Sequence, residues 1–133
     1  MITSDVALIG APQRFDPDFV IGVVLDGAAK AFYHRDVASK TIVNDFLEDT
    51  PVLVWASSSN YHIFNRQLEG QTLSFEISNG ELFDSETGSK WDISRGLAVN
   101  GSLAGMSLQL IPSLSSFDWA WIDFYPRSEF SSP

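Results

Sequence analysis

Short hydrophobic runs separated by turn-forming residues dominate this 133-residue chain. The first run, Phe19–Leu25, is rich in β-branched residues, and Asp26-Gly27 separates it from a second run, Ala28–Tyr33. An Asp-Gly pair between two such runs is typical of a β-hairpin with a tight turn, because both residues tolerate positive φ angles. The pattern therefore predicts a hairpin that turns at Asp26-Gly27.

Further strand candidates follow at similar spacing along the rest of the chain. In residues 72–77, hydrophobic and polar positions alternate, which predicts a strand with one buried face. Asn79-Gly80 then offers another tight turn. The remaining strand candidates are residues 51–55, 61–66, 82–83, 90–93, 97–99 and 107–111. Such spacing predicts a mainly β fold of the α+β class, in the form of an antiparallel barrel or a sandwich-like sheet.

A helical period replaces the strand pattern after Asp36. Apolar residues recur there with the spacing of a helix as far as about Leu47. Asp36 can act as the N-cap, since its carboxylate can accept hydrogen bonds from the free N–H groups of a first turn. We therefore expect a short central helix from Asp36 to about Leu47.

A second helix is predicted near the end of the chain. Phe117, Trp121 and Phe124 fall on one face at helical spacing, which suits packing against the sheet. Ser115 is a suitable N-cap, and Pro126 cannot continue the helix. We expect the residues after Pro126 to be held loosely.

Composition limits the possible functions. The length suits a single domain, residues 1–133, with a core of about residues 18–126, and 44% hydrophobic against 19% charged residues is typical of a folded protein. Eight basic and seventeen acidic residues give a net charge of −9, which repels phosphate backbones, so we expect no nucleic-acid partner. No apolar stretch is long enough to span a bilayer, so we expect no membrane insertion by this chain. The absence of cysteine excludes disulfides, thiol catalysis and thiolate metal ligands.

An ordered set of short motifs extends from about residue 18 to residue 126. The set comprises Val20-Ile21-Gly22-Val23 with Asp26-Gly27, Ala31-Phe32, Arg35, Ile42-Val43-Asn44-Asp45, Pro51-Val52, Phe64, Arg66, Gly70, Leu73, Phe75, Glu86-Thr87-Gly88-Ser89, Trp91, Gly101-Ser102-Leu103-Ala104-Gly105, Leu108 and Pro112. In order and approximate spacing, the set resembles an uncharacterised bacterial domain family known as a domain of unknown function. The resemblance implies a shared fold. Because we expect the family to include exported or membrane-attached proteins, it also implies an extracytoplasmic location.

The chain departs from the resembled family where the family carries its most reactive residues. The family has a Cys-Pro-Leu-Cys segment after its Pro-Val strand, a spacing suited to metal or redox chemistry, whereas this chain has the cysteine-free segment 55–60. A histidine that precedes the family's Val-Asn-Asp corresponds here to Lys40. Since serine cannot supply a thiolate, we expect that the family's site has lost its chemistry in this chain.

The leading functional hypothesis is a non-catalytic interaction or structural domain with a protein or small-molecule partner. We expect no catalytic residue, cofactor or metal site. The candidate binding residues are aromatic residues expected at the surface and the segment that replaces the cysteines, namely Trp55, Ser57, Ser58, Ser59, Asn60, His62 and Trp119. Trp91 and Trp121 are expected in the core.

Two alternatives stay open. His34, Asp36 and His62 could meet around a metal ion, or a serine of the 57–60 loop could act with His62 and a carboxylate as a hydrolase triad. Either arrangement would make the domain an enzyme or a metal-dependent accessory domain. In the second alternative, Trp55 and Trp119 stack on sugar rings in a carbohydrate-binding module. The discriminating observation is whether the histidines and the 57–60 loop converge in one cleft.

Overall fold

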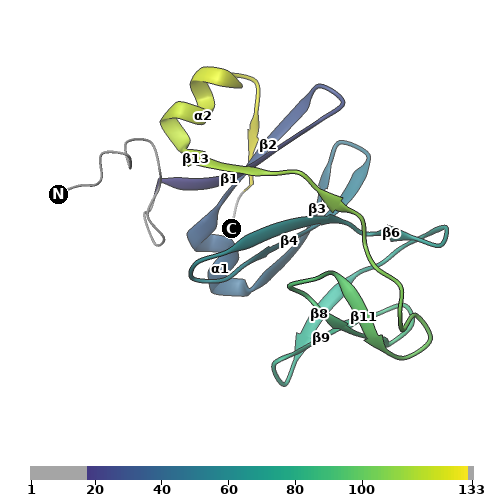
Figure 1. The fold of residues 1–133 in the computed structure, drawn as a ribbon. Coiled ribbons are helices and arrows are strands. Elements are labelled where there is room, and N and C mark those ends of the chain that lie inside the picture. Colours follow the sequence, from purple (N-terminus) through teal and green to yellow (C-terminus); the bar gives the residue numbers. More distant parts are fainter. Residues whose placement is uncertain (1–17, 132–133) are drawn as a thin grey trace.

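The computed structural model describes residues 18–131, in which short strands form several small sheets (Figure 1). The first sheet has the order β13-β1-β2-β14 and consists of β1 (Phe19–Leu25), β2 (Ala28–Tyr33), β13 (Leu114–Phe117) and β14 (Glu129–Phe130). Neighbouring strands in this sheet run antiparallel, except that β14 lies parallel to β2. The predicted hairpin at Asp26-Gly27 is confirmed, and its two turn residues have positive φ angles of 52° and 83°.

The remaining described strands form two further four-stranded sheets and one two-stranded hairpin. The second sheet has the order β12-β5-β4-β3 and consists of β3 (Ile42–Leu47), β4 (Thr50–Ala56), β5 (Tyr61–Asn65) and β12 (Leu110–Ile111). The third has the order β11-β10-β9-β8 and consists of β8 (Phe75–Ser78), β9 (Glu81–Asp84), β10 (Lys90–Asp92) and β11 (Leu97–Asn100). The hairpin pairs β6 (Gln67–Leu68) with β7 (Gln71–Thr72). The expected mainly β, sandwich-like class is confirmed, and the described strands do not close into a barrel.

Each helix of the described region directly follows a strand of the first sheet in the chain. α1 (His34–Lys40) connects β2 to β3, and α2 (Asp118–Phe124) follows β13 directly. α1 contacts β1, β2, β3 and β4, so it joins the first sheet to the second. Figure 1 shows α2 beside β13 and β1 at one end of the molecule, whereas β8, β9 and β11 lie at the opposite end.

The central helix is shorter than predicted. α1 begins at His34 after the N-cap Tyr33, not at Asp36, and it ends at Lys40. Thr41 has a φ angle of 72°, a value rare for a β-branched residue, and this turn ends the helix. The predicted second half of the helix is wrong, because residues 42–47 form β3 and pair with β4 over their whole length. Cross-strand pairing outweighs the helical spacing there.

The C-terminal helix is present but begins two residues later than its predicted N-cap implied. Ser115 lies in β13, opposite Ile21, and Phe117 is the N-cap. Trp121 is buried as expected, whereas Phe124 is 80% exposed, so the predicted apolar face of this helix is only partly correct. The prediction of a loose end is wrong up to residue 131, because β14 pairs with β2. The last two residues lie outside the described residues.

The hydrophobic core consists of clusters between neighbouring elements. The cluster between the first sheet, α1 and the second sheet includes Ile21, Phe32, Val37, Val54 and Ile63. The cluster between the second and third sheets includes Leu53, Phe64, Leu73, Phe75 and Trp91. The alternating segment 72–77 contributes Leu73 and Phe75 to this core as predicted, but Ile77 is 41% exposed and the strand begins only at Phe75.

A third, smaller cluster fixes α2 to the first sheet. Trp121 packs there with Val20 and Ala31. A Cβ atom at Gly22 would lie 2.2 Å from the Trp121 ring, so only glycine at this position lets the indole rest on β1. The Trp121 indole also donates a hydrogen bond of 2.7 Å to the Ser128 hydroxyl, which ties the helix to the segment before β14.

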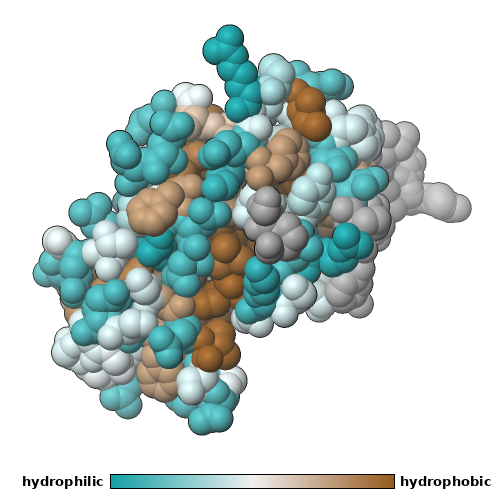
Figure 2. Space-filling model, turned by 180° about the vertical axis from the view of Figure 1, so that it is seen from behind, coloured by the Kyte–Doolittle hydropathy of each residue, from teal (hydrophilic) through white to brown (hydrophobic). Residues whose placement is uncertain are grey.

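Hydrophilic side chains cover most of the face that Figure 2 shows, with hydrophobic side chains in a narrow band near its middle. Within residues 18–131, no helix is long and apolar enough to cross a membrane.

Candidate functional site

The serine-rich segment 57–60 forms the loop of the β4–β5 hairpin. The backbone N–H of Ser57 donates to the carbonyl of Asn60 at 2.9 Å, and the Asn60 side chain accepts the N–H of Tyr61 at 2.9 Å. Ser58, Ser59 and Asn60 are exposed. The loop is therefore a tight turn with hydroxyl groups at the surface.

This loop lies next to the C-terminal end of α1. The backbone N–H of Ala56 donates to the carbonyl of Thr41 at 3.2 Å. A shallow hollow of about 280 Å³ lies between helix and loop, and it is lined by Arg35, Ala38, Ser39 and Ser58. A single guanidinium and two hydroxyl groups could bind a small polar ligand there, but the site offers no nucleophile and base in contact.

Trp55 and His62 face each other across β4 and β5. Their rings are stacked, with centroids 5.3 Å apart and planes inclined by 14°, and His62 also contacts Phe64. Both residues are half-buried rather than exposed. Because His62 covers one face of the indole, Trp55 offers less surface to a ligand than the sequence implied.

His34 is held away from solvent at the start of α1. Its side chain is 1% exposed and stacks on Phe19, with ring centroids 5.0 Å apart. Its Nδ1 atom is buried without a hydrogen-bond partner in the described structure. The imidazole is therefore part of the packing between α1 and β1.

Among residues 18–131, the two histidines form neither the proposed metal-binding group nor the proposed serine triad. In the part of the chain that the structure describes, no three His, Asp or Glu side chains come close enough to hold a metal ion, so His34, Asp36 and His62 form no such group. Likewise, no hydrogen bond within residues 18–131 joins His62 to the serines of the loop.

Asp84 is the centre of a buried polar network in the third sheet. Its side chain is 1% exposed and accepts hydrogen bonds from the Trp91 indole at 2.8 Å, the Thr87 N–H at 2.5 Å and the Thr87 hydroxyl at 2.8 Å. Burial alone would raise the pKa of Asp84, but these hydrogen bonds outweigh it and hold the pKa below its usual value. Ser89 extends the network by accepting the N–H of Leu103 at 3.1 Å.

The network explains the Glu-Thr-Gly-Ser-x-Trp stretch of the sequence. Thr87, Ser89 and Trp91 all direct polar atoms at the buried carboxylate or at one another. Both carboxylate oxygens of Asp84 accept hydrogen bonds from Thr87 or Trp91. The stretch therefore stabilises the third sheet and keeps the Asp84 carboxylate away from solvent.

Asn44 connects the second sheet to the third, and Arg66 connects the second sheet to Leu73, in each case through backbone atoms. The Asn44 side chain donates to the carbonyl of Phe75 at 2.8 Å and accepts the N–H of Phe75 at 2.9 Å. Arg66, 3% exposed, donates to the carbonyls of Val52, Leu73 and Asp45 at 2.7 to 2.8 Å. Burial lowers the pKa of Arg66, and the Asp45 carboxylate opposes that effect.

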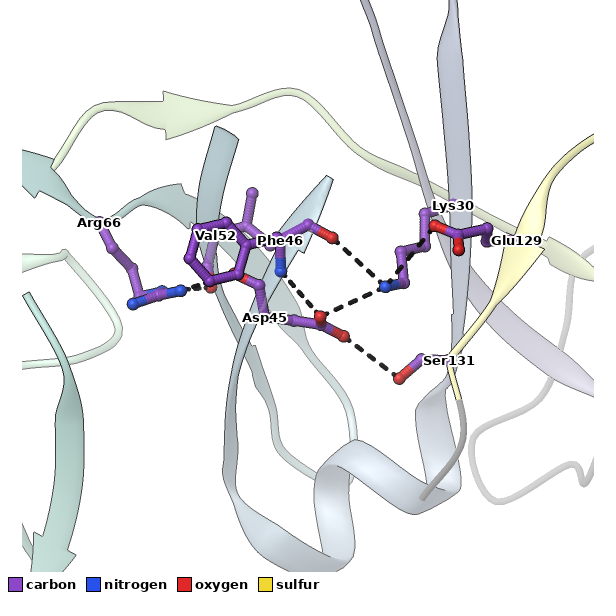
Figure 3. A network of polar contacts seen from close by, with 7 residues as sticks. All are labelled: Lys30, Asp45, Phe46, Val52, Arg66, Glu129 and Ser131. Atoms are coloured by element: carbon purple, nitrogen blue, oxygen red, sulfur yellow. Dashed lines mark hydrogen bonds and ion pairs between the residues drawn. The ribbon is translucent and has the colours of Figure 1, made fainter. Parts of the chain in front are cut away.

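Lys30 and Asp45 connect the first sheet to the second (Figure 3). The Lys30 ammonium lies 3.3 Å from an Asp45 carboxylate oxygen and 3.9 Å from Glu129 on β14. Ser131 reaches the other Asp45 oxygen at 3.4 Å. The acidic residue of the Val-Asn-Asp stretch is thus part of a joint between β2, β3 and β14.

In contrast to these satisfied polar groups, α2 leaves large apolar side chains in solvent. Trp119 is 60% exposed, Ile122 is 47% exposed and Phe124 is 80% exposed. One face of Trp119 stacks on Phe117, with ring centroids 5.7 Å apart. Trp121 is the buried residue that holds this short helix in place.

Comparison with known protein families identifies one family for this chain. Residues 8–128 match the model of a family described as a protein of unknown function, DUF3179. The chain belongs to the DUF3179 family. This match confirms the resemblance seen in the sequence over most of the chain. No curated protein and no solved structure matches this DUF3179 chain.

The fold brings together two of the places where this chain departs from the motifs of the resembled family, Lys40 and the segment 55–60. Lys40 is the last residue of α1, and Thr41 after it bonds to Ala56 at the start of the 57–60 loop. Ile42 then pairs with Trp55. The residues expected in the binding site thus lie in one region, except for Trp119, which lies on α2.

Sequence reasoning missed the hollows that flank Tyr125. The larger, of about 410 Å³, lies between the β1–β2 turn, the β3–β4 turn and residues 124–129. Its parts come from segments far apart in the chain, one of which was predicted to be a loose end. The strongest available signal was the unusual density of aromatic residues from Phe117 to Tyr125.

Proposed function

We propose that this DUF3179 domain is a non-catalytic interaction module that binds another protein through the exposed side of α2. The observation that carries the proposal is the exposure of Trp119, Ile122 and Phe124 on a helix of seven residues. Trp119 and Ile122 are three positions apart, so they lie on the same side of the helix. Exposed tryptophan beside aliphatic side chains is typical of the centres of protein interfaces.

The polar residues of the family motifs support a non-catalytic role. Backbone and side-chain groups within the domain form hydrogen bonds with Asp84, Asn44 and Arg66. A catalytic acid or base needs a free position within reach of a substrate. Structural use of these groups therefore favours an interaction function over an enzymatic one.

The domain's charge favours partners that are not acidic. With a net charge of −9, the chain attracts basic surfaces and repels nucleic acids and acidic proteins. Electrostatic attraction accelerates association, while the apolar contacts set the lifetime of a complex.

Site-specific photo-cross-linking tests the proposal. Position 119 is replaced by a photoreactive benzoylphenylalanine in the native cells, and Ile77, which is 41% exposed on β8 at the other end of the molecule, serves as the matched control position. We expect a covalent adduct of defined mass from position 119 and none from position 77. Addition of Ile122→Asp should abolish the adduct, because it places a charge beside Trp119.

The opposite result would contradict an interaction through α2. Equal adducts from both positions would indicate random encounters, and an adduct that survives Ile122→Asp would place the interface elsewhere. Thermal melts of each variant confirm that the domain remains folded.

A further inference from the structure

Two hollows meet at Tyr125 on the α2 side of the first sheet. The larger, about 410 Å³, is lined by Gly27, Ala28, Ala29, Leu47, Glu48 and residues 124–129. The smaller, about 210 Å³, is lined by Gly22, Val24, Pro112, Ser113, Leu114 and Tyr125. Tyr125 lines both, and we call the two hollows together the Tyr125 groove.

The shape of the groove depends on small residues and on one fixed ring. Gly27 and the two alanines after it contribute almost no side-chain volume, which leaves the larger hollow open. The Tyr125 ring packs against the buried Trp121, with centroids 4.4 Å apart, so it is held as a rigid divider. A preformed surface of this kind loses little entropy when a ligand binds.

The groove combines polar and apolar lining, and both hollows contribute apolar side chains. Leu47 and Phe124 face the larger hollow, while Val24, Pro112 and Leu114 face the smaller one. Phe124 is 80% exposed, and Leu114 and Val24 are 47% and 40% exposed. Contact with apolar side chains of a ligand would remove this surface from water.

Among the residues that the structure describes, the rim of the larger hollow carries one unpaired carboxylate. Glu48 lines it, and within residues 18–131 its carboxylate has no hydrogen bond or ion pair. Glu48 also holds a φ angle of 53° in a turn where glycine would be less strained. Glu129, 70% exposed, lies 3.9 Å from the Lys30 ammonium, and Arg127 also lines this hollow, so within the described residues Glu48 is the carboxylate that is left without a cation.

We propose that the Tyr125 groove binds an apolar peptide segment of a partner protein that carries a basic residue. This inference rests on the proposed interaction function and specifies the partner. Apolar side chains of the segment occupy the two hollows, and a lysine or arginine approaches the unpaired carboxylate of Glu48. A second copy of this chain is a poor occupant, because each copy carries a net charge of −9.

Fluorescence anisotropy with labelled model peptides tests the groove. The probe is a nine-residue peptide of alternating leucine and lysine, and the comparison peptides alternate leucine with glutamate or serine with lysine. We expect the leucine–lysine peptide to bind the purified chain at physiological salt and each comparison peptide to bind at least about tenfold more weakly, which corresponds to about 1.4 kcal/mol.

Matched variants separate the groove from general attraction to an acidic protein. Glu48→Gln should weaken binding of the leucine–lysine peptide about threefold to tenfold. Glu69→Gln is the control, since Glu69 is also an exposed glutamate in a tight turn, with a φ angle of 51°. Phe124→Ser should weaken binding about tenfold, whereas Ile77→Ser at the far end should not change it.

Each alternative outcome overturns the inference. An equal loss with Glu48→Gln and Glu69→Gln would show non-specific charge attraction, and unchanged binding by Phe124→Ser would place the peptide elsewhere. Displacement of the probe by a synthetic peptide of residues 1–17 at low micromolar concentration would assign the groove to this chain's own N-terminal segment. A dimer in light scattering that Phe124→Ser dissociates would assign it to a second copy.

The inference and the proposed function can fail separately. A cross-link from position 119 without peptide binding would leave the interaction function intact and refute the basic, apolar partner. Peptide binding without the cross-link would support the groove and refute an interface centred on Trp119.

Discussion

The two ends of this domain treat polar and apolar groups in opposite ways. At the third sheet, the Asp84 carboxylate is 1% exposed and surrounded by donors from Thr87 and Trp91. At the first sheet, α2 keeps Trp119 and Phe124 60% and 80% exposed. One end buries a charge, and the other exposes large apolar rings.

This contrast separates structural motifs from available surface. A buried carboxylate persists only when hydrogen bonds compensate for lost hydration, so the Asp84 network marks a region built for stability. Exposed aromatic rings contribute little to folding and become favourable when a partner covers them. The most distinctive motif of the sequence is therefore not where the domain offers a contact surface.

Trp121→Ala should have the largest effect, because it breaks the link between α2 and the first sheet. Trp121 is 1% exposed and rests on Gly22, and its indole bonds to Ser128. Truncation should reduce the free energy of unfolding by about 3 to 5 kcal/mol. Urea denaturation followed by circular dichroism measures the loss. A loss below about 1 kcal/mol would show that α2 is not anchored by this residue.

Asp84→Asn should have the next largest effect, at the opposite end. Asparagine offers one acceptor oxygen where the carboxylate offers two, so donors from Trp91 or Thr87 are left unsatisfied in the core. We expect a loss of about 2 to 4 kcal/mol in the free energy of unfolding at neutral pH. Asp123→Asn is the control, since Asp123 is exposed on α2, and it should change stability by less than about 0.5 kcal/mol.

The Asp84 effect should also depend on pH. Since the folded pKa lies below the ordinary value of 3.8, ionised Asp84 stabilises the fold fully above that value. This contribution is lost as the pH falls below 3.8 and through the folded pKa. The difference in stability between wild type and Asp84→Asn should therefore be constant from pH 7 to about pH 5 and shrink in stronger acid. A difference that grows in acid would mean that burial, not hydrogen bonding, controls this carboxyl group.

Local patterns predicted the parts of the fold that depend on near neighbours. The Asp26-Gly27 turn needs two positive φ angles, which these residue types tolerate, and the hairpin was correctly predicted. Trp121 was expected in the core because of its position on an apolar helical stripe, and it is buried. Burial of Leu73 and Phe75 is predicted by the alternation of hydrophobic and polar residues alone, and both are buried.

Long-range pairing decided the parts that the sequence did not predict. Residues 42–47 have helical spacing, yet pairing with β4 makes them a strand once Thr41 ends α1. β14 has only two residues and no strand pattern of its own, and it forms because β2 offers a free edge. The site predictions have the same limit, since burial of His34 depends on Phe19 and α1 packing together.

Replacement of Ser57, Ser58 and Ser59 together by alanine should have a small effect on stability. Ser58 and Ser59 are exposed, and the hydroxyl of Ser57 accepts only a long bond of 3.4 Å from the Ser59 N–H. The free energy of unfolding should change by less than about 1 kcal/mol. Thermal melts beside Trp121→Ala provide the comparison. A loss as large as that of Trp121→Ala would show a structural role and exclude this loop as a binding surface.

Trp119→Ser should have the smallest effect on stability. It therefore gives the sharpest contrast with the buried Trp121. Trp119 and Trp121 are the same residue type on one helix, two positions apart, but their exposed fractions are 60% and 1%. Loss of Trp119 removes the stacking contact with Phe117 and some partly exposed area, so we expect a change within about 0.5 kcal/mol. The same urea denaturation measures both tryptophan variants. If Trp119→Ser cost more than about 2 kcal/mol, the indole would be needed for folding, and its exposure would no longer point to a partner. A neutral result combined with loss of the partner cross-link in Ile122→Asp would instead assign the Trp119 side of α2 to binding, because stability and interaction would then depend on opposite sides of one helix.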